Sequence, residues 1–120
     1  MIKVLIVDDH ADIRRLLAIT LAKEFELLEA EDGASALDIV RRHRPKVVLL
    51  DVMMPGELDG LQVLEKIKDD PLNRGVVVAM VTARGQASDG DEARKRGADA
   101  YFIKPFSPME LVAWVREKGK

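Results

Sequence analysis

The chain contains 120 residues, of which 48% are hydrophobic and 33% charged, a balance typical of one globular domain rather than of a disordered or fibrous chain. A formal net charge of −2 gives no sign of a basic surface that would bind nucleic acid or an anionic membrane. The absence of cysteine excludes disulfides, thiolate nucleophiles and zinc–thiolate sites. No apolar stretch approaches the roughly 20 residues of a membrane helix, and the N-terminus lacks the apolar core of a signal peptide. We therefore expect one soluble, cytoplasmic domain over residues 1–120.

Short runs rich in Val, Ile and Leu recur along the chain and are interpreted as strands. In chain order they are Lys3–Val7, Phe25–Leu28, Lys46–Leu50, Val76–Val81 and Tyr101–Ile103. The first, third and fourth runs are apolar almost throughout, and this pattern is typical of strands buried on both faces of a parallel sheet. The second and fifth runs are shorter and less apolar.

Segments with helical spacing of apolar residues separate these runs, between residues 13 and 21, 36 and 40, 61 and 68, and 111 and 115. Strands that alternate with helices form βαβ units, whose right-handed crossovers place helices on both faces of a parallel sheet. The segment Arg84–Gly97 completes the series. Its two internal glycines, Gly85 and Gly90, each cost about 1 kcal/mol relative to alanine in a helix, so we expect this fourth helix to be short, frayed or mobile.

Polar side chains follow four of the predicted strands. Asp8 and Asp9 follow the first strand, Asp51 the third, Thr82 the fourth and Lys104 the fifth. Ligands of open parallel sheets bind beyond the carboxyl ends of the strands, so these side chains are expected to converge. Clustered carboxylates raise one another's pKa and call for a cation such as Mg²⁺, which binds carboxylates, water and phosphate oxygens. With a hydroxyl and an ammonium group beside them, the cluster predicts phosphoryl transfer, in which a carboxylate can be the nucleophile.

Four motifs in this order resemble the response-regulator receiver domain of two-component signalling. They are Ile6-Val7-Asp8-Asp9, Asp51-Val52-Met53-Met54-Pro55-Gly56, Thr82-Ala83 and Lys104-Pro105-Phe106. The resemblance covers essentially the whole chain. It implies a flavodoxin-like (βα)5 fold, doubly wound around a five-stranded parallel sheet of order 2-1-3-4-5, and a cis peptide bond before Pro105.

The resemblance also implies how the acidic residues act. Asp51 corresponds to the phosphoacceptor of the family, which receives a phosphoryl group from a histidine kinase or a histidine phosphotransfer protein. Asp8 and Asp9 correspond to the acidic pair that binds Mg²⁺ together with Asp51. Met53 corresponds to the position whose backbone carbonyl is a further ligand of that ion.

The remaining motif residues correspond to the switch of the family. Thr82 matches the hydroxyl that bonds the phosphoryl oxygen, and Lys104 matches the cation that pairs with it. Tyr101 matches the aromatic residue that turns inward as Thr82 moves. Phosphorylation would thus be a local electrostatic event that biases a two-state surface near the fourth helix, fifth strand and fifth helix, where an output protein binds.

Several residues have a structural interpretation beside the functional one. Asp9 is a favoured residue type for the N-cap of the first helix. His10 can be an exposed residue at the start of that helix or a metal ligand, and His43 lies at a charged helix end. Trp114 can pack at the boundary of the core, or it can form a partner-binding face with Tyr101 and the fourth helix, because aromatic residues dominate interfaces.

Two features depart from the family pattern. The segment Gly56–Gly60 is one residue longer than the usual loop, and the fourth helix is richer in glycine. The family positions that influence dephosphorylation are occupied by Met53 and Arg84. We interpret Met53 and Met54 as core packing and backbone ligation rather than as a thioether metal site.

We interpret the chain as an isolated receiver that catalyses its own phosphorylation and slow hydrolysis but is not a metabolic enzyme. A first alternative is a receiver excised from a longer regulator with a DNA-binding or enzymatic output. A second is a Mg²⁺-dependent phosphohydrolase, although such enzymes commonly place an acid where this chain has Met53. A third is a degenerate receiver that only binds partners, against which the complete acidic, hydroxyl and lysine set argues.

Overall fold

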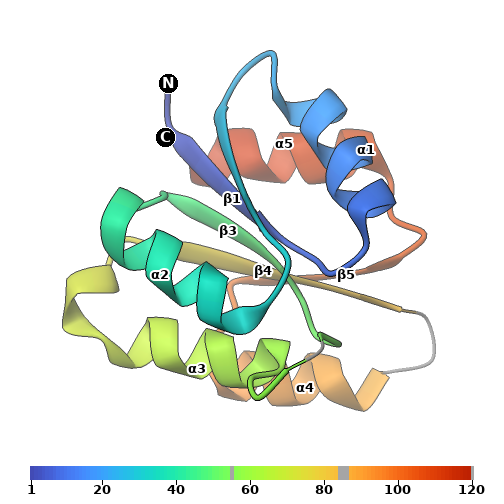
Figure 1. Cartoon of the computed structure of the whole chain (residues 1–120). Helices are drawn as coiled ribbons and strands as arrows, with labels where there is room; N and C mark the ends of the chain where they lie inside the picture. Colours follow the sequence, from blue (N-terminus) through green and yellow to red (C-terminus); the bar gives the residue numbers. More distant parts are fainter. Residues whose placement is uncertain (55, 84–86, 120) are drawn as a thin grey trace.

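Alternating strands and helices build a doubly wound α/β domain in this computed structural model. The structure describes residues 1–54, 56–83 and 87–119. For residues 82, 83 and 87–90 it describes the backbone alone. The strands are β1 (Lys3–Val7), β2 (Glu26–Ala30), β3 (Val47–Asp51), β4 (Val77–Ala83) and β5 (Ala100–Lys104). The helices are α1 (Ala11–Leu21), α2 (Gly33–His43), α3 (Gly60–Asp69), α4 (Ala87–Lys95) and α5 (Pro108–Lys118), with a 3-10 turn η1 (Pro71–Asn73). The strands pair in parallel in the order β2-β1-β3-β4-β5, so the flavodoxin-like fold is confirmed (Figure 1).

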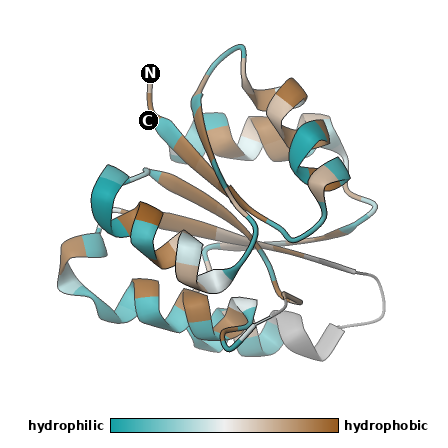
Figure 2. Cartoon of the chain, in the orientation of Figure 1, coloured by the Kyte–Doolittle hydropathy of each residue, from teal (hydrophilic) through white to brown (hydrophobic). Residues whose placement is uncertain are grey.

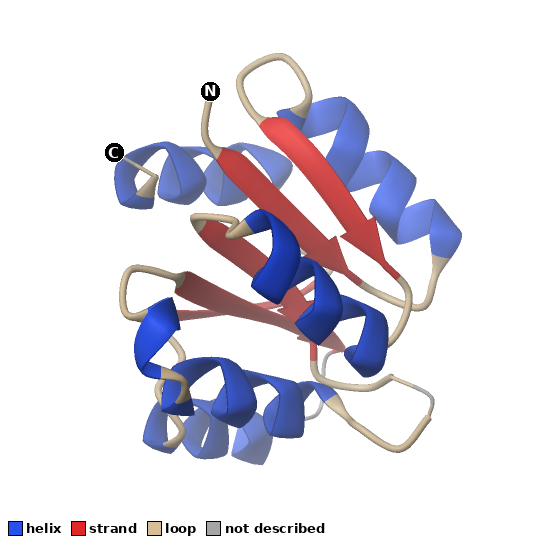
Figure 3. Ribbon diagram, turned by 60° about the vertical axis from the view of Figure 1, so that its left-hand side comes forward, coloured by secondary structure: helices blue, strands red, loops and turns tan. Residues whose placement is uncertain are grey.

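The sheet is the middle of three layers. Helices α1 and α5 cover one face, and α2, α3 and α4 cover the other (Figures 1 and 3). Alternate residues of β1 serve the two faces: Val4 and Ile6 pack beneath α1 and α5, whereas Leu5 and Val7 pack beneath α2 and α3. Figure 2 shows the result, with hydrophobic strands at the centre and hydrophilic outer faces on the helices.

Burial explains which strands the sequence predicts best. The central strands β1 and β3 are apolar and almost completely buried. Strands β2 and β5 lie at the edges of the sheet, where they are only partly covered and tolerate polar residues. The second and fifth apolar runs are therefore the weaker ones.

Three strands include a polar residue that was predicted to follow them. Asp51, Thr82 and Lys104 lie within the ends of β3, β4 and β5 rather than after them. Their backbones continue the ladder, with Asp51 opposite Val81 and Lys104 opposite Ala83. A run of apolar residues indicates which side chains are buried, and it stops at the first polar residue. Strand pairing depends on the backbone, so it continues through that residue.

Helix α4 is the least apolar layer element. It spans only Ala87–Lys95 of the predicted segment 84–97, so the prediction of a short helix is confirmed. Residues 84–86 lie outside the described residues. Of the residues after position 90 in this segment, Ala93 reaches the core, and Ala98, just after the segment, packs against the core. Among the described helices, none combines the length and the apolar character needed to cross a membrane.

Local signals fix where the helices begin. Asp32 caps α2 by accepting a hydrogen bond from the backbone N–H of Ser35, and Ser107 caps α5 in the same way. Asp59 and Gln62 form a reciprocal capping box at the start of α3. The capping box fixes the end of the loop that follows β3.

The first residue of α3 packs against the backbone at the end of β3. The N–H of Gly60 donates to the carbonyl oxygen of Val52 at 2.8 Å. A Cβ atom on Gly60 would lie 2.0 Å from the carbonyl oxygen of Asp51 and 2.7 Å from Cα of Val52. Since both of these atoms belong to the backbone, neither can rotate away, and only glycine fits.

We predict that Gly60→Ala lowers the free energy of unfolding by about 3 kcal/mol or more, at the upper end of the cost of overpacking. The matched control is Gly75→Ala, because a Cβ atom there meets only the Lys46 ammonium at 3.9 Å. Denaturant unfolding of both variants measures the difference. Equal stability of the two variants would contradict the close approach of α3 to β3.

Candidate functional site

Three of the predicted site residues meet at the carboxyl end of the central strands. The ammonium nitrogen of Lys104 lies 2.9 Å from Oδ2 of Asp8 and 3.5 Å from Oδ2 of Asp51. Both carboxylates are almost fully buried, with side-chain exposures of 3% and 5%. Residues from β5, from β3 and from the turn after β1 therefore form one compact charged cluster.

Asp8 is held more tightly than Asp51. Its Oδ1 accepts a 2.8 Å hydrogen bond from the backbone N–H of His10, while its Oδ2 accepts from Lys104. By contrast, among the described residues Asp51 accepts a 3.3 Å bond from the backbone N–H of Met53 and has the longer contact with Lys104. Asp51 is thus the buried carboxylate with the weaker hydrogen bonds.

Burial raises the pKa of Asp51, and the negative charge of Asp8 raises it further. The positive charge of Lys104 and the N–H of Met53 act in the opposite direction but do not cancel these effects. Burial alone would lower the pKa of Lys104. The hydrogen bond to Asp8 and the charges of both carboxylates outweigh burial, so the pKa of Lys104 is raised and its ammonium group stays charged.

Asp9 and His10 lie at the exposed rim of this cluster. Nδ1 of His10 is 3.1 Å from Oδ1 of Asp8 and 3.1 Å from Oδ1 of Asp9. The structural alternative for Asp9, a role as N-cap beside the preferred metal role, is excluded, because α1 begins at Ala11 and its N-cap residue is His10. The exposure expected for His10 is confirmed, since 64% of its side chain is accessible.

The acidic residues fit a divalent cation. Asp8, Asp9, His10 and Asp51 each offer a ligand atom, and these atoms lie within 4.8 Å of one another. Two of the carboxylates are buried beside each other with one ammonium group between them, so a cation would relieve their repulsion. Carboxylate oxygens are the ligands that Mg²⁺ prefers.

The two methionines after β3 differ in burial. Met54 packs against the core, as expected. Met53 is 59% exposed, so the expectation of core packing is wrong for its side chain. Only its backbone faces Asp51, through the N–H described above.

Thr82 lies at the same edge by register. Its backbone is paired with Ile103 in β5, one residue before Lys104. The side chain of Thr82 and the whole of Arg84 lie outside the described residues, so the roles expected for them stay predictions.

Tyr101 and Trp114 pack on opposite faces of the sheet. Tyr101 contacts the core beneath α2, α3 and α4, whereas Trp114 contacts the core beneath α1 and α5. The Trp114 ring meets Phe102 edge to face, with ring centroids 5.9 Å apart. Boundary packing therefore accounts for Trp114, and a joint partner surface with Tyr101 stays a hypothesis.

Arg14 is a site neighbour that the sequence did not single out. Its Nη1 donates to the backbone carbonyl of Asp8 at 2.6 Å, and its Nε pairs with Glu29 at 3.3 Å. It lies on α1 within the apolar helical pattern, where a cation is ordinarily a solvated surface residue. Its proximity to Asp8 depends on how α1 crosses the sheet, and no local pattern reports that crossing.

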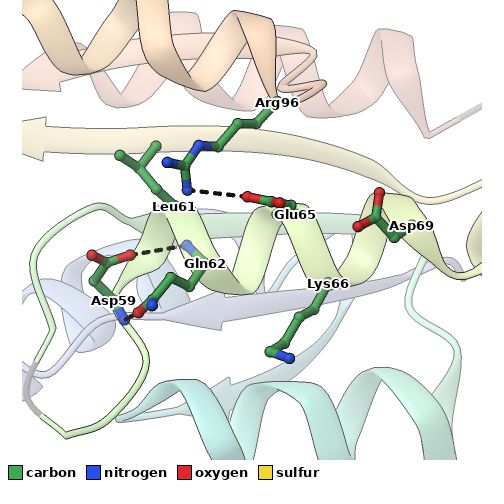
Figure 4. Close-up of a pocket in the computed structure, with 7 residues that line it drawn as sticks. All are labelled: Asp59, Leu61, Gln62, Glu65, Lys66, Asp69 and Arg96. Atoms are coloured by element: carbon green, nitrogen blue, oxygen red, sulfur yellow. Dashed lines mark hydrogen bonds and ion pairs between the residues drawn. The ribbon is translucent and has the colours of Figure 1, made fainter.

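A second polar hollow lies away from this edge, between α3 and the turn after α4 (Figure 4). Arg96 pairs across it with Glu65 at 3.2 Å, and the capping box of Asp59 and Gln62 forms one end. These four side chains are paired with one another, and the Arg96–Glu65 contact joins α3 to the turn after α4.

We predict that Asp51→Asn raises the melting temperature at neutral pH in chelator-containing buffer. Because folding raises the pKa of Asp51, its ionised form costs stability in full above the raised pKa, and the cost declines as the pH falls from there to the ordinary value of an aspartate. The gain should therefore shrink on acidification. Asp38→Asn is the control, since the side chain of Asp38 is about half exposed and pairs with Arg42 at 3.1 Å. A gain of the same size there would refute the explanation.

Comparison with known proteins agrees with this geometry. The family model described as the response regulator receiver domain matches residues 4–116. The phosphate regulon transcriptional regulatory protein PhoB of Klebsiella pneumoniae is 40% identical over 115 residues, which are 95% of this chain and 50% of PhoB. The transcriptional regulatory protein SrrA of Staphylococcus aureus (strain NCTC 8325 / PS 47) is also 40% identical over 115 residues, 95% of this chain and 46% of SrrA.

A solved structure shows the same fold. The receiver domain of NtrX from Brucella abortus superposes with a TM-score of 0.88 at 33% identity, and the match covers 96% of both chains. The chain spans about half the length of the curated relatives described above. The sequence match over nearly all of the chain and the shared fold together show that it belongs to the response-regulator receiver family and is a receiver domain of two-component signalling.

Proposed function

We propose that this receiver accepts a phosphoryl group on Asp51 from a phosphohistidine of a histidine kinase or a histidine phosphotransfer protein. The observation that carries the proposal is the contrast between the two buried carboxylates. Within the part of the chain that the structure describes, both oxygens of Asp8 are engaged at 2.8–2.9 Å, whereas those of Asp51 have contacts of 3.3 and 3.5 Å. A desolvated carboxylate with weak hydrogen bonds is the better nucleophile.

In the proposed reaction, an oxygen of Asp51 attacks the phosphorus of the phosphohistidine. An O–P bond forms, the N–P bond breaks, and the donor imidazole leaves with the electron pair of that bond and takes up a proton. Lys104 lies close enough to Asp51 to pair with an oxygen of the transferred group. Asp8 keeps Lys104 in this place through its 2.9 Å contact.

The same edge would hold Mg²⁺ through Asp8, Asp9 and Asp51, with the backbone carbonyl of Met53 as a further ligand, as the family resemblance implies. When bound, the ion supplies positive charge that offsets the charge of the phosphoryl oxygens. Within the described residues, the protein supports this role by gathering carboxylate oxygens at one edge.

We further propose that phosphorylation changes the face formed by α4, β5 and α5. Thr82 and Tyr101 would transmit the change, and their position supports this, because they lie on the neighbouring strands β4 and β5. Exposed apolar residues on this face, Ile103 and Met109, offer contacts for an output partner. The chain would act as a switch with slow self-hydrolysis rather than as a metabolic enzyme, since Met53 supplies no acid beside Asp51.

A second candidate is a receiver that is part of a longer regulator with a DNA-binding output. The names of the curated relatives favour it, because PhoB and SrrA are transcriptional regulators of about twice the matched length. The length of the genomic reading frame distinguishes this candidate from a single-domain receiver.

We predict that incubation with Mg²⁺ and a small acyl-phosphate donor adds one phosphoryl group to the protein. Intact mass spectrometry at short times measures the adduct. It should be absent in Asp51→Asn and after chelation of Mg²⁺. Asp38→Asn should be modified like the parent protein. An adduct on Asp51→Asn would place the reaction elsewhere, and no adduct under any condition would favour a receiver that only binds partners.

We predict that Lys104→Ala separates metal binding from phosphoryl transfer. Removal of the ammonium group should slow phosphorylation by about tenfold or more, because one preorganised charge partner of the phosphoryl oxygens is lost. Mg²⁺ affinity should not fall, since the variant removes a positive charge beside the carboxylates. Calorimetry and a time course of intact mass measure the two effects, with Lys23→Ala, which is exposed, as control. Parallel loss of both properties would contradict the assigned role.

A further inference from the structure

His10 brings a nitrogen atom to the acidic edge that the proposed phosphoryl transfer does not use. Its Nδ1 lies 3.1 Å from Oδ1 of Asp8 and 3.1 Å from Oδ1 of Asp9. The ligand atoms of His10, Asp8, Asp9 and Asp51 all fall within 4.8 Å of one another. Three consecutive residues and the end of β3 therefore present nitrogen and oxygen atoms to a common point.

The spacing of these atoms matches that of neighbouring ligands around one ion. In an octahedral site with bonds of roughly 2.1 Å, adjacent ligand atoms lie about 3.0 Å apart. The two separations of 3.1 Å from Nδ1 of His10 agree with that value. A hydrogen bond between the imidazole and each carboxylate explains the same distances. The measured affinity for a nitrogen-preferring ion therefore decides between a hydrogen-bonding role and a ligand role for His10.

We propose that His10 is a nitrogen ligand of this site and gives it a preference for transition-metal dications such as Co²⁺ over Mg²⁺. The inference rests on the proposed function, because it adds a ligand to the same acidic edge. Imidazole suits Co²⁺, Ni²⁺ and Zn²⁺, whereas Mg²⁺ takes oxygen ligands. His10 would therefore determine which metal the receiver holds.

The surroundings of His10 allow it to ligate. Its backbone N–H donates to Oδ1 of Asp8 at 2.8 Å, which keeps the residue beside the carboxylates. Its side chain is 64% exposed, so Nε2 can carry the ring hydrogen toward water while Nδ1 binds the ion. Although His10 is the N-cap residue of α1, its side chain makes no capping hydrogen bond, so its replacement removes none from the start of α1.

The test compares the parent protein, His10→Ala and His43→Ala, each without a histidine tag and stripped of metal. His43 is the other histidine of the sequence and lies at the end of α2. Calorimetry gives the dissociation constants for Co²⁺ and for Mg²⁺ separately, and visible absorption reports nitrogen ligation of Co²⁺.

His10→Ala should weaken Co²⁺ binding by about tenfold or more and shift the spectrum, because loss of a ligand costs at least as much as loss of its supporting partner. It should change Mg²⁺ binding by less than about twofold, since Mg²⁺ takes oxygen ligands, and His43→Ala should match the parent.

The ratio of the two affinities decides the question. If His10→Ala leaves that ratio and the Co²⁺ spectrum unchanged, His10 is only a hydrogen-bond partner and the proposal is overturned. Phosphorylation with Mg²⁺ and an acyl phosphate is measured on the same samples. Phosphorylation with an unchanged ratio defeats the His10 proposal alone, whereas a reduced ratio without phosphorylation defeats the proposed function and leaves the nitrogen ligand standing.

Discussion

Lys104 contacts two buried carboxylates at once, at 2.9 Å from Asp8 and 3.5 Å from Asp51. Without that ammonium group, two negative charges would face each other in a low-dielectric setting, and their repulsion would favour protonation or displacement of one of them. In the sequence, Lys104 lies 96 positions after Asp8 and 53 positions after Asp51. The contact therefore depends on the sheet, which brings the ends of β1, β3 and β5 to one edge. The electrostatics of the edge and the topology of the sheet therefore depend on each other.

The backbone around Asp51 limits how that edge can move. Gly60 lets α3 approach the end of β3 so closely that a Cβ atom would touch the Asp51 carbonyl. On the other side, Arg14 holds the carbonyl of Asp8 from α1. The end of β3 is thus held by α3, and the turn after β1 is held by α1.

The α4 side of the domain is held differently from the rest. Of the residues after position 90, α4 contributes only Ala93 to the core, so polar contacts take over part of the packing. Asp99 accepts from Lys68 at 2.8 Å and from the backbone N–H of Val78 at 2.8 Å, and Arg96 pairs with Glu65 at 3.2 Å. Ion pairs near the surface contribute less than apolar burial, so weaker contacts hold this layer than hold the layers over the apolar core.

The sequence by itself determined the alternation of strands and helices, the two-sided burial of β1 and β3, and the identity of the residues at the carboxyl edge, because burial and backbone preference are written in local patterns. The strand order came from family resemblance, and only the tertiary structure decided the pairing of Lys104 with both carboxylates, since that contact spans the sheet. It also decided that Asp9 faces the His10 ring instead of capping α1, that Arg14 reaches Asp8, and that Tyr101 and Trp114 lie on opposite faces. Each of these depends on where one element crosses another, a relation that no run of neighbouring residues encodes.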